Sequence, residues 1–169
     1  MKRGEVGFWY QPNTAMGFAP KKSGDVGHDL LSAIEFDEMT RIERLVAKIA
    51  KVKVPMVILW PFSLRSIRTE MHLVMGKSMW CEIVSRSSAA QRSIMVIGGI
   101  IDSGYIGELY TVIHNVGFRP RIIKRGERYS QVIFHEAVRP TTTQLGARRF
   151  KELAKTRERG IAGFGSTGV

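Results

Sequence analysis

The sequence has 169 residues, of which 44% are hydrophobic and 24% charged, so it is long enough for one domain with a buried core. It contains no apolar run near the roughly 20 residues that span a bilayer, which excludes a transmembrane helix. The net charge of +11 indicates an anionic partner, for which nucleic acid, a nucleotide polyphosphate and a membrane surface all qualify.

The distribution of the basic residues indicates which anionic partner to expect, and the cysteine count indicates the cellular compartment. Lys and Arg are spread along the chain without interleaved aromatic residues, so the support for sequence-specific nucleic-acid binding is weak. We expect mostly solvated charge, a few cations aimed at phosphates, and no membrane partner. The single cysteine, Cys81, excludes an internal disulfide and is typical of a packing residue. Because the N-terminal residues also lack an apolar signal core, we expect a cytoplasmic protein.

The first strand-like stretch is Val6–Tyr10, and residues 23–33 follow as a Gly-spaced loop that enters a short apolar run. Asp29 stands in the middle of this loop, directly after Gly27 and His28. An acid in this setting is typical of a turn. Coordination of a metal or of water is the alternative interpretation.

Residues 37–51 predict one amphipathic helix in an otherwise strand-like chain. Thr40 and, three residues later, Glu43 form a capping-box signature. The apolar side chains fall on one helical stripe and the basic side chains on the opposite one: Met39, Ile42, Leu45, Val46, Ile49 and Ala50 against Arg41, Arg44, Lys48 and Lys51. We expect the apolar stripe to pack on the domain itself. A membrane-surface or nucleic-acid contact through the basic stripe is the alternative.

The remaining elements before residue 140 are short strands between turn residues, which predicts an all-β domain. The predicted strands are residues 54–60, 71–75, 80–84, 93–97, 109–114, 120–123 and 129–134. Residues 85–90 place hydroxyl side chains around Arg86 at the end of a strand. This pattern binds phosphate oxygens or opens a short helix, and one site can do both.

Residues 98–108, Gly-Gly-Ile-Ile-Asp-Ser-Gly-Tyr-Ile-Gly-Glu, predict a Gly-punctuated hairpin between two strands. They carry one central carboxylate, Asp102. Bare glycine backbone beside a single acid suits a small ligand that main-chain groups read while the acid does chemistry. An ordinary Asp-Ser-Gly turn is the alternative.

The strand pattern stops beyond Pro140. Residues 142–156 are helix-like with few large apolar side chains, and residues 159–169 are rich in glycine. Such an end cannot build a core, so it is either a disordered tail or an arm that closes over a ligand. We therefore divide the chain into one β domain over residues 1–158 and a mobile arm over residues 159–169.

Five separated stretches resemble, in order and spacing, the five motifs of the trimeric deoxyuridine triphosphatases (dUTPases). They are Gly27-His-Asp-Leu30, Arg86-Ser-Ser88, Gly99-Ile-Ile-Asp-Ser-Gly-Tyr-Ile-Gly107, Gly126-Glu-Arg-Tyr-Ser-Gln131 and Arg159-Gly-Ile-Ala-Gly-Phe-Gly-Ser-Thr-Gly168. The resemblance implies a jelly-roll-like subunit with a helical insertion at residues 37–51, in a homotrimer that exchanges its C-terminal arms. It also implies hydrolysis of dUTP to dUMP and pyrophosphate by water attack at the α-phosphate, assisted by Mg²⁺. That reaction lowers dUTP and supplies dUMP for thymidylate synthesis.

The same resemblance assigns roles to individual residues. Asp102, Asp29 and Gln131 would be catalytic: Asp102 would orient or deprotonate the attacking water, and Asp29 would hold the waters bound to Mg²⁺. The expected substrate-binding residues are Arg86, Ser87, Ser88, Val96, Gly99, Ile101, Tyr105, Arg159, Phe164, Gly165, Ser166 and Thr167. Of these, the first three would lie near the phosphates, backbone at residues 96–99 would read the uracil, and Tyr105 would lie under the deoxyribose. The arm residues would come from a neighbouring subunit, with Phe164 over the uracil.

Three alternatives stay open. A dCTP deaminase, which shares the implied fold, needs a Glu five residues after the last hairpin glycine, and Val112 stands there. The flanks of the motifs depart from the family pattern, for example at Ser85 and Ser88, so a hydrolase of a modified dUTP is a second alternative. A regulator that binds a protein or nucleic acid through the inserted helix is the third.

Overall fold

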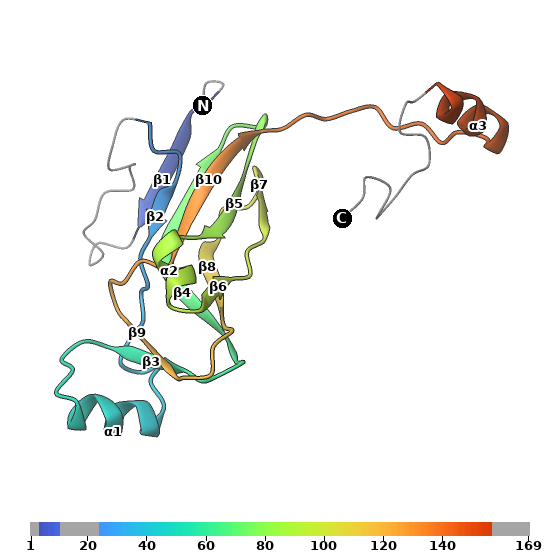
Figure 1. Ribbon diagram of the computed structural model, residues 1–169. Helices are drawn as coiled ribbons and strands as arrows, with labels where there is room; N and C mark the ends of the chain where they lie inside the picture. The colour runs from blue at the N-terminus through green and yellow to red at the C-terminus, as the bar shows by residue number, and fades with distance from the viewer. Residues whose placement is uncertain (1–3, 11–23, 157–169) are drawn as a thin grey trace. The chain divides into compact units, whose positions relative to one another are not determined.

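The computed structural model describes residues 4–10 and 24–156, and backbone alone at Tyr10 (Figure 1). The chain divides into two compact units, residues 1–137 and residues 138–169, which are described separately. In the second unit, the described part forms helix α3 (Ala147–Lys155), inside the segment predicted to be helical. None of the helices in the described ranges is long and apolar enough to cross a membrane.

The first unit is built from three antiparallel sheets. The first has the order β1 (Val6–Tyr10), β4 (Leu64–Met75), β8 (Glu108–Asn115) and β6 (Ile94–Val96). The second has the order β2 (His28–Leu30), β10 (Ser130–Glu136), β5 (Met79–Ser85) and β7 (Ile100–Asp102). The third pairs β3 (Met56–Leu59) with β9 (Arg121–Lys124). The predicted all-β class is confirmed.

The core lies between the two four-stranded sheets, because alternate residues of each strand point inward. On β5, Met79, Cys81 and Ile83 are buried, and they cluster with Leu109 from the opposite sheet. Burial raises the pKa of the Cys81 thiol to about 12. Cys81 is therefore a packing residue, as predicted.

Helix α1 (Arg41–Ile49) begins as predicted, but only part of the predicted apolar stripe packs on the domain. The Thr40 side chain caps the Glu43 N–H, and the Glu43 carboxylate accepts from the Thr40 N–H. Of this stripe, Met39 is buried and Val46 packs beside it, as predicted. Ile42, Leu45 and Ile49 are exposed instead, whereas Glu43 and Ala47 are buried. The reason is that Glu43 also accepts from the Ile58 N–H at 2.8 Å and pairs with Arg65 at 3.0 Å, so a carboxylate docks the helix on β3.

The predicted hairpin at residues 98–108 is also corrected. The flanking strands β6 and β8 do pair, but the chain between them leaves the first sheet and forms β7, which pairs with β5 of the second. Asp102 consequently lies on a strand, opposite Trp80. Gly98 makes this crossing possible, since a Cβ there would lie 1.7 Å from the Ile83 carbonyl oxygen.

Candidate functional site

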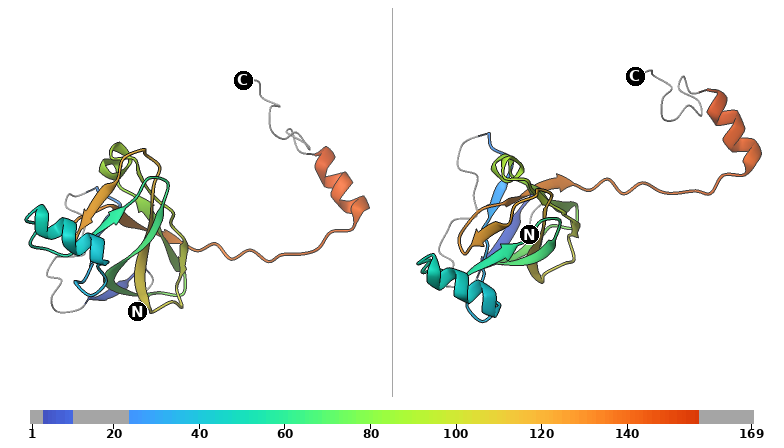
Figure 2. Two further views of the ribbon diagram at one scale, coloured as in Figure 1. Left: turned by 90° about the horizontal axis from the view of Figure 1, so that it is seen from below. Right: turned by 60° about the horizontal axis from the view of Figure 1, so that its bottom comes forward.

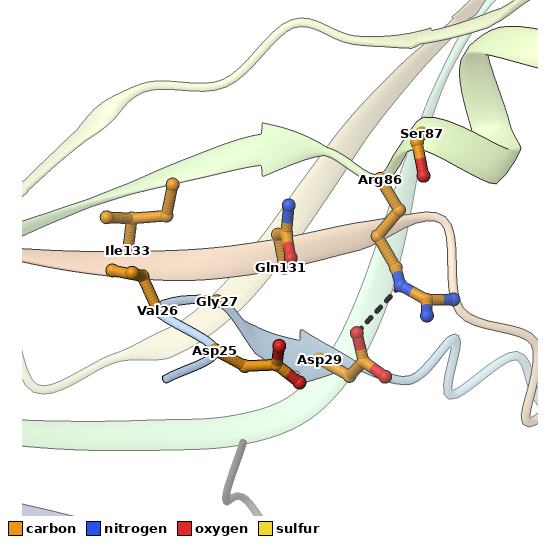
Figure 3. Close-up of a pocket in the computed structure, with 8 residues that line it drawn as sticks. All are labelled: Asp25, Val26, Gly27, Asp29, Arg86, Ser87, Gln131 and Ile133. Carbon is orange, nitrogen blue, oxygen red and sulfur yellow. Dashed lines mark ion pairs between the residues drawn. The ribbon is translucent and has the colours of Figure 1, made fainter. Parts of the chain in front are cut away.

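A pocket of about 380 Å³ opens at the edge of the second sheet (Figure 3). It is lined by Asp25, Val26, Gly27, Asp29, Arg86, Ser87, Gln131 and Ile133. These residues come from the segment around β2, from the junction of β5 with helix α2 (Ser87–Gln91), and from β10. Four predicted site residues, Asp29, Arg86, Ser87 and Gln131, are therefore brought together from three stretches that are far apart in the sequence.

Asp29 lies on β2 and not in a turn, and two arginines hold its carboxylate. Arg86 Nε lies 2.7 Å from Asp29 Oδ1 (Figure 3). Arg128 Nη1 lies 3.0 Å from Asp29 Oδ2. Arg86 is itself fixed, because its N–H donates to the Tyr129 carbonyl and its guanidinium to the Arg128 carbonyl. Sequence reasoning did not name Arg128 as a site residue, although it belongs to the stretch from Gly126 to Gln131.

Gln131 is the register partner of Asp29 on the neighbouring strand, so their side chains lie on the same face. Its carboxamide covers Gly27, where a Cβ would lie 2.1 Å from Gln131 Oε1. Gln131 Nε2 also faces the Ser85 carbonyl oxygen at 3.4 Å. A glycine at residue 27 is thus needed for the observed position of the Gln131 side chain.

The turn that carries Arg128 is tied to the segment that carries Asp29. Ser32 Oγ donates to the Lys124 carbonyl at 2.6 Å, and the Ser32 N–H donates to the Glu127 carbonyl at 2.9 Å. Arg125 in the same turn pairs with the buried Glu70 at 3.3 Å. These contacts fix the distance between β2 and the turn before β10. They therefore hold Asp29 and Arg128 close enough to form their ion pair.

A second pocket of about 340 Å³ adjoins the first, and Arg86 lines both. Ser88 lines this second pocket and not the first, together with Arg92 and Arg128. Tyr129 lies at its base, where its hydroxyl donates to Glu127 and accepts from Arg92 Nη1. Burial, with the Glu127 contact, raises the pKa of the Tyr129 phenol, so it stays neutral.

The remaining described site residues form a separate group on the β6–β8 connection. Asp29 on β2 and Asp102 on β7 lie on the two outer strands of the second sheet, three strand spacings apart. Along the strand direction, the register places them four residues apart, so the two residues are separated by roughly 20 Å. Val96, Gly99, Ile101 and Tyr105 accompany Asp102 there. Within one chain, Asp102 therefore does not reach the first pocket.

Backbone groups in this second group are partly engaged already. The Val96 N–H donates to Ser85 Oγ at 2.8 Å, and the Ile97 N–H donates to the Val112 carbonyl at 2.8 Å. These two donors are already bonded within the chain, and the reading of the uracil by backbone at residues 96–99 stays a prediction. The Tyr105 hydroxyl donates to the Glu108 carbonyl at 2.8 Å, and the residue is 45% exposed.

The other expected features concern the arm and the metal. Arg159, Phe164, Gly165, Ser166 and Thr167 lie outside the described residues. Within residues 4–10 and 24–156, no three His, Cys, Asp or Glu side chains cluster as a metal cage. The first pocket does offer two carboxylates, Asp25 and Asp29. That donor set fits Mg²⁺, which protein sites often bind through one or two carboxylates, waters and substrate phosphates.

The family model for dUTPase matches residues 54–168 of this chain. The chain belongs to the dUTPase family. The Pol polyprotein of caprine arthritis encephalitis virus (strain Cork) is 31% identical over 153 residues, which are 90% of this chain but only 11% of that protein. The deoxyuridine 5′-triphosphate nucleotidohydrolase of Paramecium bursaria Chlorella virus 1 is 35% identical over 105 residues, covering 62% of this chain and 70% of the relative.

Solved structures show the same fold at low sequence identity. A variant of the Staphylococcus bacteriophage 80alpha dUTPase with dUpNHpp aligns with a TM-score of 0.76 at 20% identity, over 98% of this chain and 99% of its own. The dUTPase of EIAV aligns with a TM-score of 0.63 at 17% identity, over 85% of this chain and 98% of its own. The expected jelly-roll-like subunit of the family is thereby confirmed.

Proposed function

We propose that the protein hydrolyses dUTP to dUMP and pyrophosphate. The observation that carries this proposal is the convergence of Asp29, Arg86, Ser87 and Gln131 in one pocket, since they come from three separate stretches that each resemble a different part of the family signature. The pocket combines guanidinium, hydroxyl and carboxamide groups, which are the groups that bind a phosphate chain.

The phosphate chain would bind by replacing contacts within the protein. Arg86 and Arg128 now both pair with Asp29. A triphosphate that enters the pocket takes over these guanidinium contacts, because it carries more charge and more acceptor oxygens than one carboxylate. Ser87 then lies beside the leaving pyrophosphate, and Gln131 is held over Gly27 to contact the chain.

The same exchange frees Asp29 for the metal. Asp29, with Asp25 beside it, would hold waters bound to Mg²⁺. When bound, Mg²⁺ neutralises charge on the phosphate oxygens. Arg86 and Arg128 add fixed positive charge on the same oxygens, so the protein itself stabilises the charge that develops as the α-phosphate is attacked.

Asp102 would reach the substrate from a second subunit of a homotrimer. Its separation of roughly 20 Å from Asp29 is too large for one active site within one chain. Around it, Ile100 and Ile106 are each 68% exposed, which is typical of a surface that another protein covers. There Asp102 would take a proton from the attacking water, and Tyr105 would lie under the deoxyribose. Backbone at Gly99 and Ile101 would read the uracil.

The arm of a further subunit would close the site. Phe164 would cover the uracil, while Arg159, Gly165, Ser166 and Thr167 would bind the terminal phosphates. A cytoplasmic location is part of the proposal and rests on the one buried cysteine, Cys81.

Pyrophosphate release from dUTP, dCTP, dTTP, UTP and a 5-substituted dUTP, with and without Mg²⁺, tests this function. The proposal expects Mg²⁺-dependent cleavage of dUTP, and a loss of at least about a thousandfold in Asp102→Asn. Equal cleavage of the 5-substituted nucleotide would favour the modified-dUTP alternative, and ammonia release from dCTP would favour deamination. Absence of cleavage by a folded oligomer would overturn the proposal.

A further inference from the structure

The solvent-facing side of α1 carries an apolar stripe formed by Ile42, Leu45 and Ile49. These side chains are 60%, 57% and 73% exposed. Their spacing of i, i+3 and i+7 aligns them along one side of the helix. Single exposed aliphatic residues are common, but three in line on one helix are typical of a contact surface.

A basic stripe formed by Arg41, Arg44 and Lys48 runs beside the apolar stripe. The spacing is again i, i+3 and i+7, and all three side chains are exposed. In the described part of the chain none of them pairs with a carboxylate, and Arg44 donates to the backbone oxygens of Phe36 and Asp37. The one acid of the helix, Glu43, faces β3 and is buried. The outer surface of α1 therefore carries apolar and cationic side chains, and no residue of the helix places a carboxylate there.

We propose that this surface docks a partner protein through an acidic amphipathic helix. Aliphatic side chains of the partner would pack on the apolar stripe, and its carboxylates would pair with the basic stripe. This inference is independent of the hydrolysis reaction. α1 packs on β3, outside the two four-stranded sheets, whereas the first pocket is lined from β2, α2 and β10 (Figures 1 and 2).

Charge and composition favour this occupant over three others. A second copy of α1 would bring the same cations to the contact with no exposed acid on the helix to offset them. Nucleic acid would pair with the basic stripe but leave the apolar stripe in water. An anionic lipid surface is disfavoured because α1 itself has no aromatic residue for the membrane interface.

The test uses a labelled synthetic helical peptide with leucines at i, i+3, i+4 and i+7 and glutamates on one flank. A scrambled peptide of the same composition and a peptide with lysines in place of the glutamates are the comparators. Fluorescence anisotropy with the full-length protein is expected to show at least about tenfold tighter binding of the acidic peptide than of either comparator.

Two variants separate the contributions of the stripes. The double variant Leu45→Ser, Ile49→Ser is expected to lose the preference for the ordered peptide over the scrambled one. The double variant Arg44→Glu, Lys48→Glu is expected to prefer the lysine peptide, while dUTP turnover stays at the wild-type rate in both. Equal binding of the ordered and scrambled peptides would overturn the proposal. So would tighter binding to phosphatidylserine vesicles or to duplex DNA, or self-association that both variants abolish.

Discussion

The carboxamide of Gln131 lies directly over Gly27, and a Cβ on residue 27 would be 2.1 Å from Gln131 Oε1. The blocking atom is the far end of a flexible side chain, which can rotate away. A side chain at residue 27 would therefore displace Gln131 from the pocket without breaking the sheet.

Gly27→Ala is accordingly expected to inactivate the protein while leaving it folded. We expect dUTP turnover to fall by about tenfold or more, because Gln131 no longer lies where it can contact the phosphate chain. The melting temperature should change by only a few degrees. Steady-state kinetics and thermal unfolding measure the two effects, and full activity in the variant would show that the position of Gln131 is unimportant.

Gly98→Ala is expected, in contrast, to lower the stability of the protein. A Cβ at residue 98 would lie 1.7 Å from the Ile83 carbonyl oxygen, and backbone cannot rotate away. We expect the free energy of unfolding in urea to fall by about 2 kcal/mol or more. Gly99→Ala is the matched control, since nothing lies within 4 Å of a Cβ there, and its stability should change by less than about 1 kcal/mol. Similar stabilities for the two variants would contradict the packing at the crossing.

Arg128→Gln tests a residue that sequence reasoning did not assign to the site. Arg128 Nη1 lies 3.0 Å from Asp29 Oδ2, and Arg128 lines the second pocket. Loss of this cation is expected to raise the KM for dUTP about tenfold, because one charge-assisted contact to the phosphates disappears. Arg148→Gln, at an exposed site on α3, is the control and should leave KM unchanged.

Glu43 is expected to make stability depend on pH. Burial pushes its pKa up, but hydrogen bonds from Ile58 and Thr40, with the Arg65 charge, hold the pKa below its ordinary value of 4.5. The carboxylate therefore stabilises the fold fully above about pH 4.5, and this contribution is lost as the pH falls through the lowered pKa.

Glu43→Gln should consequently cost about 1–3 kcal/mol near pH 7, and the difference from wild type should shrink in acid. Urea unfolding of both proteins near pH 7 and at a pH below the lowered pKa of Glu43 measures this difference in the free energy of unfolding. Glu38→Gln, an exposed site in the preceding loop, should change stability by less than about 0.5 kcal/mol. A difference for Glu43→Gln that is constant with pH would contradict the role of the charge.

Cys81 is expected to be chemically silent in the folded protein. Its side chain is fully buried on β5, and burial raises its pKa to about 12, so almost no thiolate forms near neutral pH. A disulfide reagent at pH 8 should label the native protein far more slowly than protein unfolded in urea. Rapid labelling of native protein would show that the β5 core opens.

Much of the fold follows from local patterns that the sequence displays. The alternation of buried and outward residues on β5 and β8 matches the predicted strands, and Thr40 with Glu43 marks the start of α1. These features depend on neighbours in the chain, so a period or a capping pair reveals them.

The remaining features depend on partners far along the chain. The face of α1 follows from Ile58 and Arg65, which satisfy the Glu43 carboxylate, and no helical period contains that information. The crossing into β7 depends on β5 having an unpaired edge. Likewise, the motif likeness placed Asp29 in the site, but its ion pairs with Arg86 and Arg128 arise only when β2 lies beside β10.

The proposed active site takes Asp29 from one subunit and Asp102 from another. Co-refolding an equal mixture of Asp29→Asn and Asp102→Asn subunits tests it most directly, with pyrophosphate release from dUTP as the readout. Each variant alone should be nearly inactive, and random mixing should restore activity at about a quarter of the sites. A mixture as inactive as its components, although mass spectrometry shows mixed oligomers, would contradict the shared site.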